Sequence, residues 1–172
     1  MILKNIEIKA RINDYEKVKR LVEDLCSTPI RTEDQIDTFF NTPTGRLKLR
    51  KSDSNAEIIY YNRPDSFEPT QSDIAISFTE NPNTLKTVLA KSIGIRGIVK
   101  KNRTLYKYGQ TRIHFDDVEG LGKFIEIEVV LKSDQTSKEG EAIANELMDK
   151  FNIQKTDLID VAYIDLIETI CA

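Results

Sequence analysis

The chain has 172 residues, of which 40% are hydrophobic and 31% are charged, and its formal net charge is −3. This length suits one domain with a buried core, and no apolar run approaches the roughly 20 residues of a membrane-spanning helix, so disordered and membrane classes are excluded. The negative net charge and modest aromatic content argue against a nucleic-acid-binding surface, although a single pocket can still be strongly basic.

The first half of the chain predicts strands with charged polar faces. Residues 3–12 alternate polar and aliphatic side chains with the period of a β-strand. A helix is expected over residues 13–25, where Asn13 and Asp14 supply the start signal and an apolar stripe follows. Short strands are expected at 35–41, 45–51, 56–63 and 74–78, an exposed loop at 64–72, and a helix at 82–93.

The second half continues in the same way. Strands are expected over 96–107, 111–118 and 123–131, with a hairpin turn at EGLG (119–122) and helices over 137–151 and 161–170. Short strands in hairpins, with helices inserted and appended, predict an α+β domain whose antiparallel strands close into a barrel. We expect one such domain over residues 1–172.

The charged residues on these strands fall into short rows. Any one row could simply face water, as the polar face of a half-buried strand usually does. Together they are harder to explain in that way, because like charges in adjacent positions repel one another and weaken strand pairing. The basic rows are Arg46, Lys48 and Arg50 on one strand and Lys101 and Arg103 on another, and the other rows are Glu7 with Lys9 and Glu126 with Glu128.

A triphosphate accompanied by a divalent cation would satisfy these rows. Arginine and lysine form charge-assisted hydrogen bonds with phosphate oxygens, and Mg²⁺ or Mn²⁺ takes carboxylate oxygens as ligands. Glu126 and Glu128 lie two residues apart on one strand and could share an ion, with Glu7 and Asp116 joining them from neighbouring strands. The residues therefore predict a metal-dependent site for a triphosphate.

Several competing chemistries are excluded. His114 is the only histidine, which rules out a Ser-His-Asp or Cys-His hydrolase and a multi-histidine metal site. We expect His114 to have a supporting or structural role. The chain also has no GxxxxGK or GxGxxG phosphate loop.

The cysteines and the first residues indicate a compartment. Cys26 and Cys171 are far apart and form no Cys-x-x-Cys motif, which predicts free thiols and no zinc site. The opening residues, MILKNIEIKA, do not have the pattern of an export signal. We expect a cytoplasmic protein.

Six segments resemble the CYTH family, the triphosphate tunnel metalloenzymes. They are NIEIKAR at 5–11, QIDTFFNTPTGRLKLR at 35–50, EIIYYNRPD at 57–65, VKKNRTLY at 99–106, TRIHFDDVEGLGKFIEIEV at 111–129 and AYIDLI at 162–167. The family includes class IV adenylate cyclases, thiamine triphosphatases and inorganic tripolyphosphatases, and the chain is most similar to the CyaB-like class IV cyclases. The resemblance implies an eight-stranded antiparallel tunnel that binds a triphosphate through basic residues and one or two divalent cations through acidic ones.

The resemblance also implies roles for individual residues. Glu7 and Lys9 match the N-terminal ExExK signature and, with Arg103, are the expected catalytic residues. The expected metal ligands are Glu7, Asp116, Glu126 and Glu128. The expected phosphate-binding residues are Arg46, Lys48, Arg50, Arg63, Lys101, Arg103 and Arg112. Gln35, Asp37, Tyr60 and Tyr61 are weaker candidates, and core packing explains the two tyrosines equally well.

One position departs from the signature. Asn5 stands where the family's motif has its first glutamate, so this chain has one carboxylate fewer. The change puts the affinity for metal, or the occupancy of a second ion, in question. Related CyaB-like sequences share the form NxExK, so we do not interpret it as a loss of activity.

The leading hypothesis is conversion of ATP to cyclic AMP and pyrophosphate with Mg²⁺ or Mn²⁺. Hydrolysis of tripolyphosphate, thiamine triphosphate or a nucleoside triphosphate in the same tunnel is the main alternative, and a non-catalytic triphosphate-binding module is a further one. No base-recognition motif is identifiable, so the preference for a cyclase rests on the resemblance. We expect a small triphosphate as the partner, no nucleic acid or membrane, and a homodimer as a possible assembly.

Overall fold

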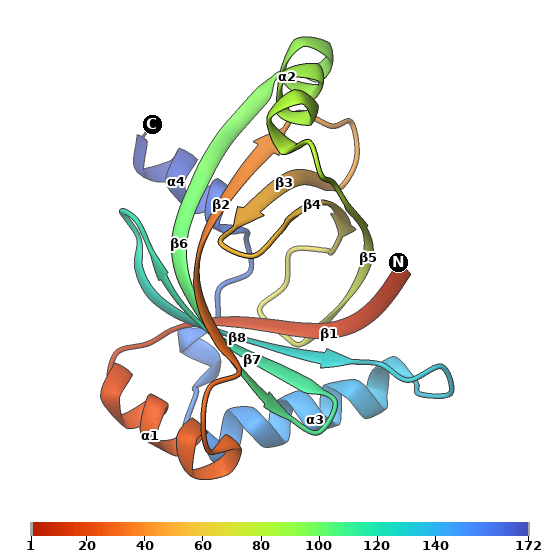
Figure 1. Ribbon diagram of the computed structural model, residues 1–172. Helices are drawn as coiled ribbons and strands as arrows, with labels where there is room; N and C mark the ends of the chain where they lie inside the picture. The colour runs from red at the N-terminus through yellow and green to blue at the C-terminus, as the bar shows by residue number, and fades with distance from the viewer. Residues whose placement is uncertain (1, 172) are drawn as a thin grey trace.

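Eight antiparallel strands close into a barrel in the computed structural model, which describes residues 2–171 and the side chains of residues 4–170 (Figure 1). Around the barrel the strands follow the order β1-β5-β4-β3-β2-β6-β7-β8. Their bounds are β1 (Ile2–Arg11), β2 (Arg31–Phe40), β3 (Arg46–Ser52), β4 (Ala56–Asn62), β5 (Thr70–Phe78), β6 (Ile95–Tyr108), β7 (Thr111–Val118) and β8 (Gly122–Val130). The helices are α1 (Tyr15–Cys26), α2 (Pro82–Ile93), α3 (Ser137–Lys150), the short 3₁₀ helix η1 (Lys155–Asp157) and α4 (Tyr163–Cys171). The α+β barrel expected from the sequence is confirmed.

Two strands begin earlier than their local sequence predicts. β2 starts at Arg31 instead of residue 35, because residues 31–34 pair with β6. The exposed loop expected over 64–72 is wrong for its last three residues, because residues 70–72 begin β5 and pair with β1. In both cases the pairing partner is distant in the chain, so the turn-forming composition of the segment does not reveal the strand.

The two faces of the strands have opposite environments. Ile6, Ile8 and Ala10 of β1 point outward and are buried in a cluster with residues of α1 and α3, which lie together beneath the barrel in Figure 1. Glu7 and Lys9 alternate with them along the strand and line the barrel interior. The main hydrophobic core therefore lies outside the barrel, and its interior is left for charged side chains.

α4 packs against one end of the barrel. Its first residues, Tyr163 and Ile164, are buried in a second cluster with the inward-facing Phe39 and Val99. β6 comes close to the helix at Gly97, where a Cβ atom would lie 2.5 Å from Ile164 Cδ1. The segment at the start of α4 therefore covers this end of the interior.

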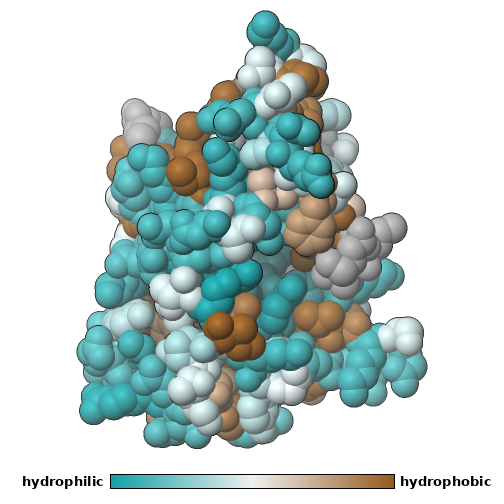
Figure 2. Space-filling view, viewed as in Figure 1, coloured by the Kyte–Doolittle hydropathy of each residue, from teal (hydrophilic) through white to brown (hydrophobic). Residues whose placement is uncertain are grey.

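The remaining sequence expectations concern membrane-spanning helices, the surface and the cysteines. Within residues 2–171, none of the helices has both the length and the apolar character needed to cross a bilayer. The face shown in Figure 2 is predominantly hydrophilic. Cys26 is a free thiol as expected, and the expectation for Cys171 falls on a side chain outside those described.

α3 lies so close to β1 that Gly140 has no room for a side chain. A Cβ atom there would lie 2.6 Å from Ile6 Cγ1 and 2.6 Å from Leu131 Cδ2. We expect Gly140→Ala to lower the free energy of unfolding, because overpacking costs about 1–3 kcal/mol and the better helix propensity of alanine offsets only about 1 kcal/mol. Urea unfolding measures this change. Asn145→Ala, at an exposed position of the same helix, is the control and should not destabilise; unchanged stability for Gly140→Ala would contradict the close packing.

Candidate active site

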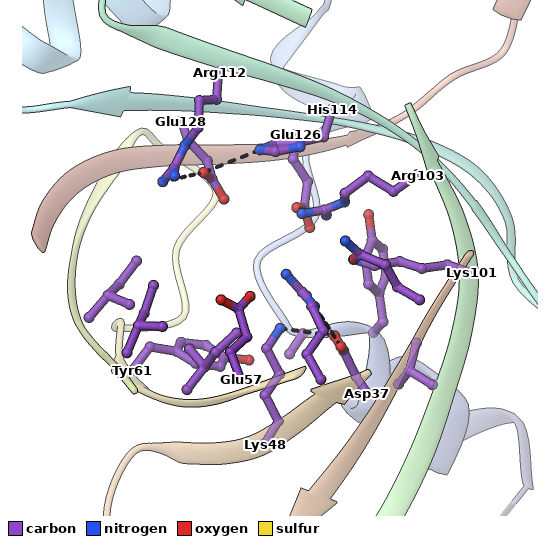
Figure 3. A pocket seen from close by; sticks show the side chains of 18 of the residues that line it. Asp37, Lys48, Glu57, Tyr61, Lys101, Arg103, Arg112, His114, Glu126 and Glu128 are labelled. Carbon is purple, nitrogen blue, oxygen red and sulfur yellow. Dashed lines mark hydrogen bonds and ion pairs between the residues drawn. The ribbon is translucent and has the colours of Figure 1, made fainter. Parts of the chain in front are cut away.

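A cavity of about 370 Å³ occupies the barrel interior and is lined by residues from all eight strands. Most of the residues expected to form a site line it, namely Glu7, Lys9, Lys48, Arg50, Arg63, Lys101, Arg103, Arg112, Glu126 and Glu128. Figure 3 shows Glu126 and Glu128 on one side of this cavity and Lys48 with Asp37 on the opposite side. The volume lies within the range of about 300–1,000 Å³ that is usual for small-ligand sites.

Arg46 and Asp116 are the two expected residues that do not line the cavity. Arg46 begins β3 near α4, and its guanidinium forms ion pairs of 2.9 Å with Asp65 and 2.9 Å with Asp165. Its expected phosphate contact stays a prediction. Asp116 faces the same side of the sheet as Arg103, its partner in the β6–β7 register, and is buried by its contacts with Lys101, Arg103 and Tyr163. Its expected role as a metal ligand stays a prediction.

The first charged cluster joins β2 and β3. Both Nε and Nη2 of Arg50 donate to Asp37 at 2.7 Å, and Lys48 Nζ donates to the same carboxylate at 3.0 Å. Burial disfavours the charged form of Asp37, but Arg50 and Lys48 outweigh it and hold the pKa of this carboxyl well below its usual range. Asp37 is thus an anion fixed between two cations, a role that its alternating position in β2 could have indicated.

The second cluster centres on Arg103. Its guanidinium donates to Asp116, with Nε 2.6 Å from Oδ1, and also contacts Glu126. Lys101 Nζ lies 3.1 Å from Asp116 and Tyr163 donates its hydroxyl to the same carboxylate at 2.9 Å. Burial, reinforced by the positive charge of Arg103, lowers the pKa of Lys101 to about 7. Tyr163 was not singled out from the sequence, because the contact joins α4 to a strand that is distant in the chain.

Three carboxylates share the wall formed by β1 and β8. Glu7 lies opposite Glu128 in the strand register, and Glu126 is the neighbouring inward-facing residue of β8, two positions before Glu128. Burial raises the pKa of Glu7, and the negative charges of Glu126 and Glu128 raise it further against the opposing charge of Arg63. Such a group of hard oxygen donors, whose mutual repulsion a cation would relieve, fits Mg²⁺ or Mn²⁺.

These carboxylates are engaged by cations of the chain in the present conformation. Glu128 pairs with Arg112 at 2.9 Å and lies 3.2 Å from His114 Nε2, while Glu126 contacts Arg103. Among the residues whose side chains are described, no three His, Cys, Asp or Glu side chains converge on one point. Side-chain rotation away from these cations would therefore accompany the binding of an ion. The supporting role expected of His114 stays a prediction.

Asn5 lies in a neutral part of the interior. It is fully buried and pairs in register with Ser72 of β5. Within the described side chains, both polar atoms of its amide and the hydroxyl of Ser72 lack a hydrogen-bond partner. Asn5 therefore adds no charge to the carboxylate wall beside it.

One wall of the cavity is apolar, a feature that the charge pattern of the sequence does not predict. β4 and β5 pair with Ile59 opposite Ile76 and Tyr61 opposite Ile74, and all four residues line the cavity. Tyr61 is thus a cavity residue, whereas Tyr60 points away and packs over Gly45. The charged clusters come from the other strands, so the interior has a charged side and an apolar side.

The mouth of the cavity carries a further unanticipated acid. Glu57 begins the inward row of β4, and its carboxylate points into the cavity in Figure 3. Its alternation with Ile59 and Tyr61 along the strand could have identified it. Among the described side chains Glu57 forms no ion pair, unlike Glu126 and Glu128.

The segment before α4 is held by two cavity cations. Lys9 Nζ donates to the carbonyl oxygen of Val161 at 3.1 Å, and Arg63 Nη2 donates to that of Asp160 at 2.8 Å. Lys9 Nζ also lies 4.2 Å from the centre of the Tyr163 ring. These contacts tie the C-terminal segment to the deep end of the site.

Comparison with known proteins matches the CYTH domain family over residues 3–163. A Methanocaldococcus jannaschii protein, provisionally named an adenylate cyclase, is 28% identical over 174 residues, which cover 94% of this chain and 97% of that protein. A Pyrococcus horikoshii structure has a TM-score of 0.83 at 26% identity and covers 94% of this chain and 98% of that one. A Hippeastrum protein, described as a provisional adenylyl cyclase with a dominant triphosphatase activity, shares the fold at a TM-score of 0.68, with 14% identity over 97% of this chain and 95% of that one.

Removing Arg103 should expose the importance of its buried ion pairs. Arg103→Met leaves Glu126 and Asp116 with fewer cations, and we expect a loss of about 3–5 kcal/mol in the free energy of unfolding at neutral pH. Burial opposes ionisation of Asp116, but Arg103 lowers its pKa to about 2 from the usual 3.8, so its stabilising contribution is present above 3.8 and is lost as the pH falls towards 2. The difference between Arg103→Met and the unmodified protein should therefore shrink in acid.

Urea unfolding at neutral and acidic pH measures both parts of that prediction. Arg20→Met, at an exposed position of α1, is the matched control and should change stability by less than about 0.5 kcal/mol. A loss for Arg103→Met that does not depend on pH would contradict an electrostatic origin.

Proposed function

The chain belongs to the CYTH family, and from this membership and the geometry of the cavity we propose that it is a divalent-metal-dependent enzyme that converts ATP to cyclic AMP and pyrophosphate. The observation that carries the proposal is that cations and carboxylates line one cavity on facing walls. A triphosphate–metal complex needs both sets at once, because its oxygens take positive donors while its metal takes oxygen ligands.

The phosphate chain would lie along the cations of β3 and β6. Lys48 has three N–H donors and uses one on Asp37, so two remain for phosphate oxygens. Lys101 and Arg103 of β6 both contact Asp116, which fixes the positions of their side chains in the cavity wall. These residues would orient the triphosphate before reaction, so little ordering of side chains would be needed when the substrate binds.

Glu7, Glu126 and Glu128 would hold the Mg²⁺ or Mn²⁺ ion. The ion, when bound, supplies positive charge that polarises the phosphate oxygens and stabilises the leaving pyrophosphate. Asn5 supplies an uncharged side chain at the position of the signature's first glutamate, so we expect weaker binding of a second ion than of the first. Lys9 and Arg103 lie on either side of Glu126, where they would neutralise negative charge that develops on the reacting phosphate.

The main alternative is hydrolysis of a triphosphate in the same cavity. The Hippeastrum protein, which shares the fold, is described as having a dominant triphosphatase activity, and water in place of the ribose hydroxyl would give that reaction. The apolar wall of β4 and β5 favours a substrate with an organic half over inorganic tripolyphosphate, because inorganic phosphate makes no use of apolar surface. A non-catalytic binding module has no evident need for the three carboxylates.

The cytoplasmic location, the homodimer and the absence of nucleic-acid and membrane partners stay predictions.

The products distinguish these reactions. Purified protein with ATP, tripolyphosphate or thiamine triphosphate and Mg²⁺ or Mn²⁺ should yield cyclic AMP and pyrophosphate from ATP. Glu126→Gln and Glu128→Gln should each lower that rate by roughly 100-fold or more, since changing even the partners of metal ligands costs about 10- to 100-fold. Glu119→Gln alters an acid whose side chain is 71% exposed and should leave the rate unchanged. If orthophosphate is the main product, the protein is a triphosphatase and not a cyclase. Full activity of both glutamine variants would refute the assignment of Glu126 and Glu128 as metal ligands.

Lys101 should take up a proton when the substrate binds. Its pKa is lowered to about 7, so above that pH the free protein holds it largely neutral, and a neighbouring phosphate favours the charged form. Calorimetric titration with an ATP analogue that carries a methylene bridge between the α and β phosphates, in buffers of different ionisation enthalpy, measures the protons taken up. We expect nearly one proton about one pH unit above the pKa and few about one unit below it.

Lys101→Arg is the matched variant, because arginine stays charged throughout this range. The uptake should disappear in it while the analogue still binds. Equal proton uptake by both proteins would contradict a neutral Lys101 in the phosphate site.

A further inference from the structure

The side chain of Gln35 is held in one orientation. Gln35 is 3% exposed, and its Nε2 donates to Glu33 Oε1 at 2.7 Å. Glu33 is itself positioned by the hydroxyl of Ser54 at 3.3 Å and by Arg31 at 3.4 Å. An ionised carboxylate only accepts hydrogen bonds, so the amide nitrogen must face Glu33 and the amide oxygen must face elsewhere.

That amide oxygen has no partner. Gln35 lines the cavity, and its Oε1 is a buried acceptor to which no donor in the described part of the chain is directed. Buried acceptors in native proteins are nearly always paired with protein, water or ligand donors. A ligand that offers an N–H group at this point would satisfy it without disturbing the contact with Glu33.

Gln35 borders the phosphate-binding cations. Along the inward face of β2, Asp37 pairs in register with Arg50, and Gln35, the next inward residue, pairs with Lys101 of β6. Ile74 and Ile76 of β5 contribute the apolar wall of the same cavity. A nucleotide whose phosphates bind Lys48, Arg50 and Lys101 would therefore have its organic half in a cavity that offers an apolar surface and, beside Lys101, one fixed acceptor.

We propose that Gln35 is a specificity-determining residue, whose side-chain oxygen accepts a hydrogen bond from the exocyclic amino group of a nucleobase. The inference rests on the proposed function, since it takes the substrate to be a nucleoside triphosphate. An aminopurine offers an N–H donor at its six-position, whereas a keto purine offers an oxygen there. Two acceptors facing one another in a buried site repel, so the keto nucleotide is disfavoured.

Glu33 restricts the Gln35 amide to its role as a hydrogen-bond acceptor for the ligand. A free glutamine amide can rotate to present either its donor or its acceptor, and would then accept both kinds of purine. Here the donor end is used by Glu33, which leaves only the acceptor for the ligand. The discrimination therefore depends on Glu33 as a positioning residue as well as on Gln35.

The test compares ATP with inosine triphosphate, which replaces the six-amino group by a keto group. With Mg²⁺, we expect the unmodified enzyme to favour ATP in kcat/KM by roughly 10- to 100-fold. Gln35→Met, which keeps the length of the side chain and removes the oxygen, should reduce this ratio to within about threefold, chiefly by raising KM for ATP. Its inhibition constant for tripolyphosphate should stay unchanged, because the phosphate-binding residues are intact. Gln154→Met, at an exposed position, should keep the full preference.

A second variant guards against misfolding of the first. Gln35→Asn keeps the amide but shortens it, and should also lose the preference while tripolyphosphate still binds. Equal use of ATP and inosine triphosphate by the unmodified enzyme, or a full preference in Gln35→Met, would overturn the proposal. If the enzyme releases orthophosphate from ATP and its preference for ATP depends on Gln35, the role of Gln35 stands and the cyclase reaction is refuted. If it forms cyclic nucleotides equally from both substrates, the role of Gln35 is refuted and the cyclase reaction stands.

Discussion

The structure depends on pairing many buried charges inside a barrel. Lys48 and Arg50 would be costly to bury alone, and the same is true of the carboxylates on the opposite wall, because charges lose hydration when they leave water. Asp37 forms ion pairs with both Lys48 and Arg50, and Arg103 pairs with both Asp116 and Glu126. The interior is therefore a set of internal ion pairs. A triphosphate with its metal would exchange with these pairs and would not enter an empty charged space.

The arrangement of the hydrophobic core makes this interior possible. Ile6 and Ile8 of β1 pack outward with α1 and α3, so the strands do not need their inner faces for apolar packing. Where the inner face is apolar, at Ile59 and Ile76, it forms one side of the cavity. The result is a substrate site with a charged side and an apolar side, and the fixed acceptor of Gln35 lies beside Lys101 on the charged side.

Local sequence pattern predicted the inner faces of several strands but not the contacts between distant segments. Strict alternation identified Lys101 and Arg103 as neighbours on one face, and the structure places both on the cavity. The start of β5 was missed because its strand character comes from pairing with β1. Asp116 is expected to be a metal ligand; the structure pairs it with Arg103, its partner in the β6–β7 register, and the metal role stays a prediction. The contact between Tyr163 and Asp116 depends on tertiary packing that no local periodicity reveals.

The central claim is that the internal ion pairs mark the place of a triphosphate and its metal. A crystal structure with Mn²⁺ and the methylene-bridged ATP analogue tests it most directly. The account predicts phosphate oxygens against Lys48, Arg50, Lys101 and Arg103, anomalous scattering from Mn²⁺ beside Glu126 and Glu128, and the base towards Gln35. An analogue bound outside the barrel, or Mn²⁺ absent from the carboxylate wall, would contradict it.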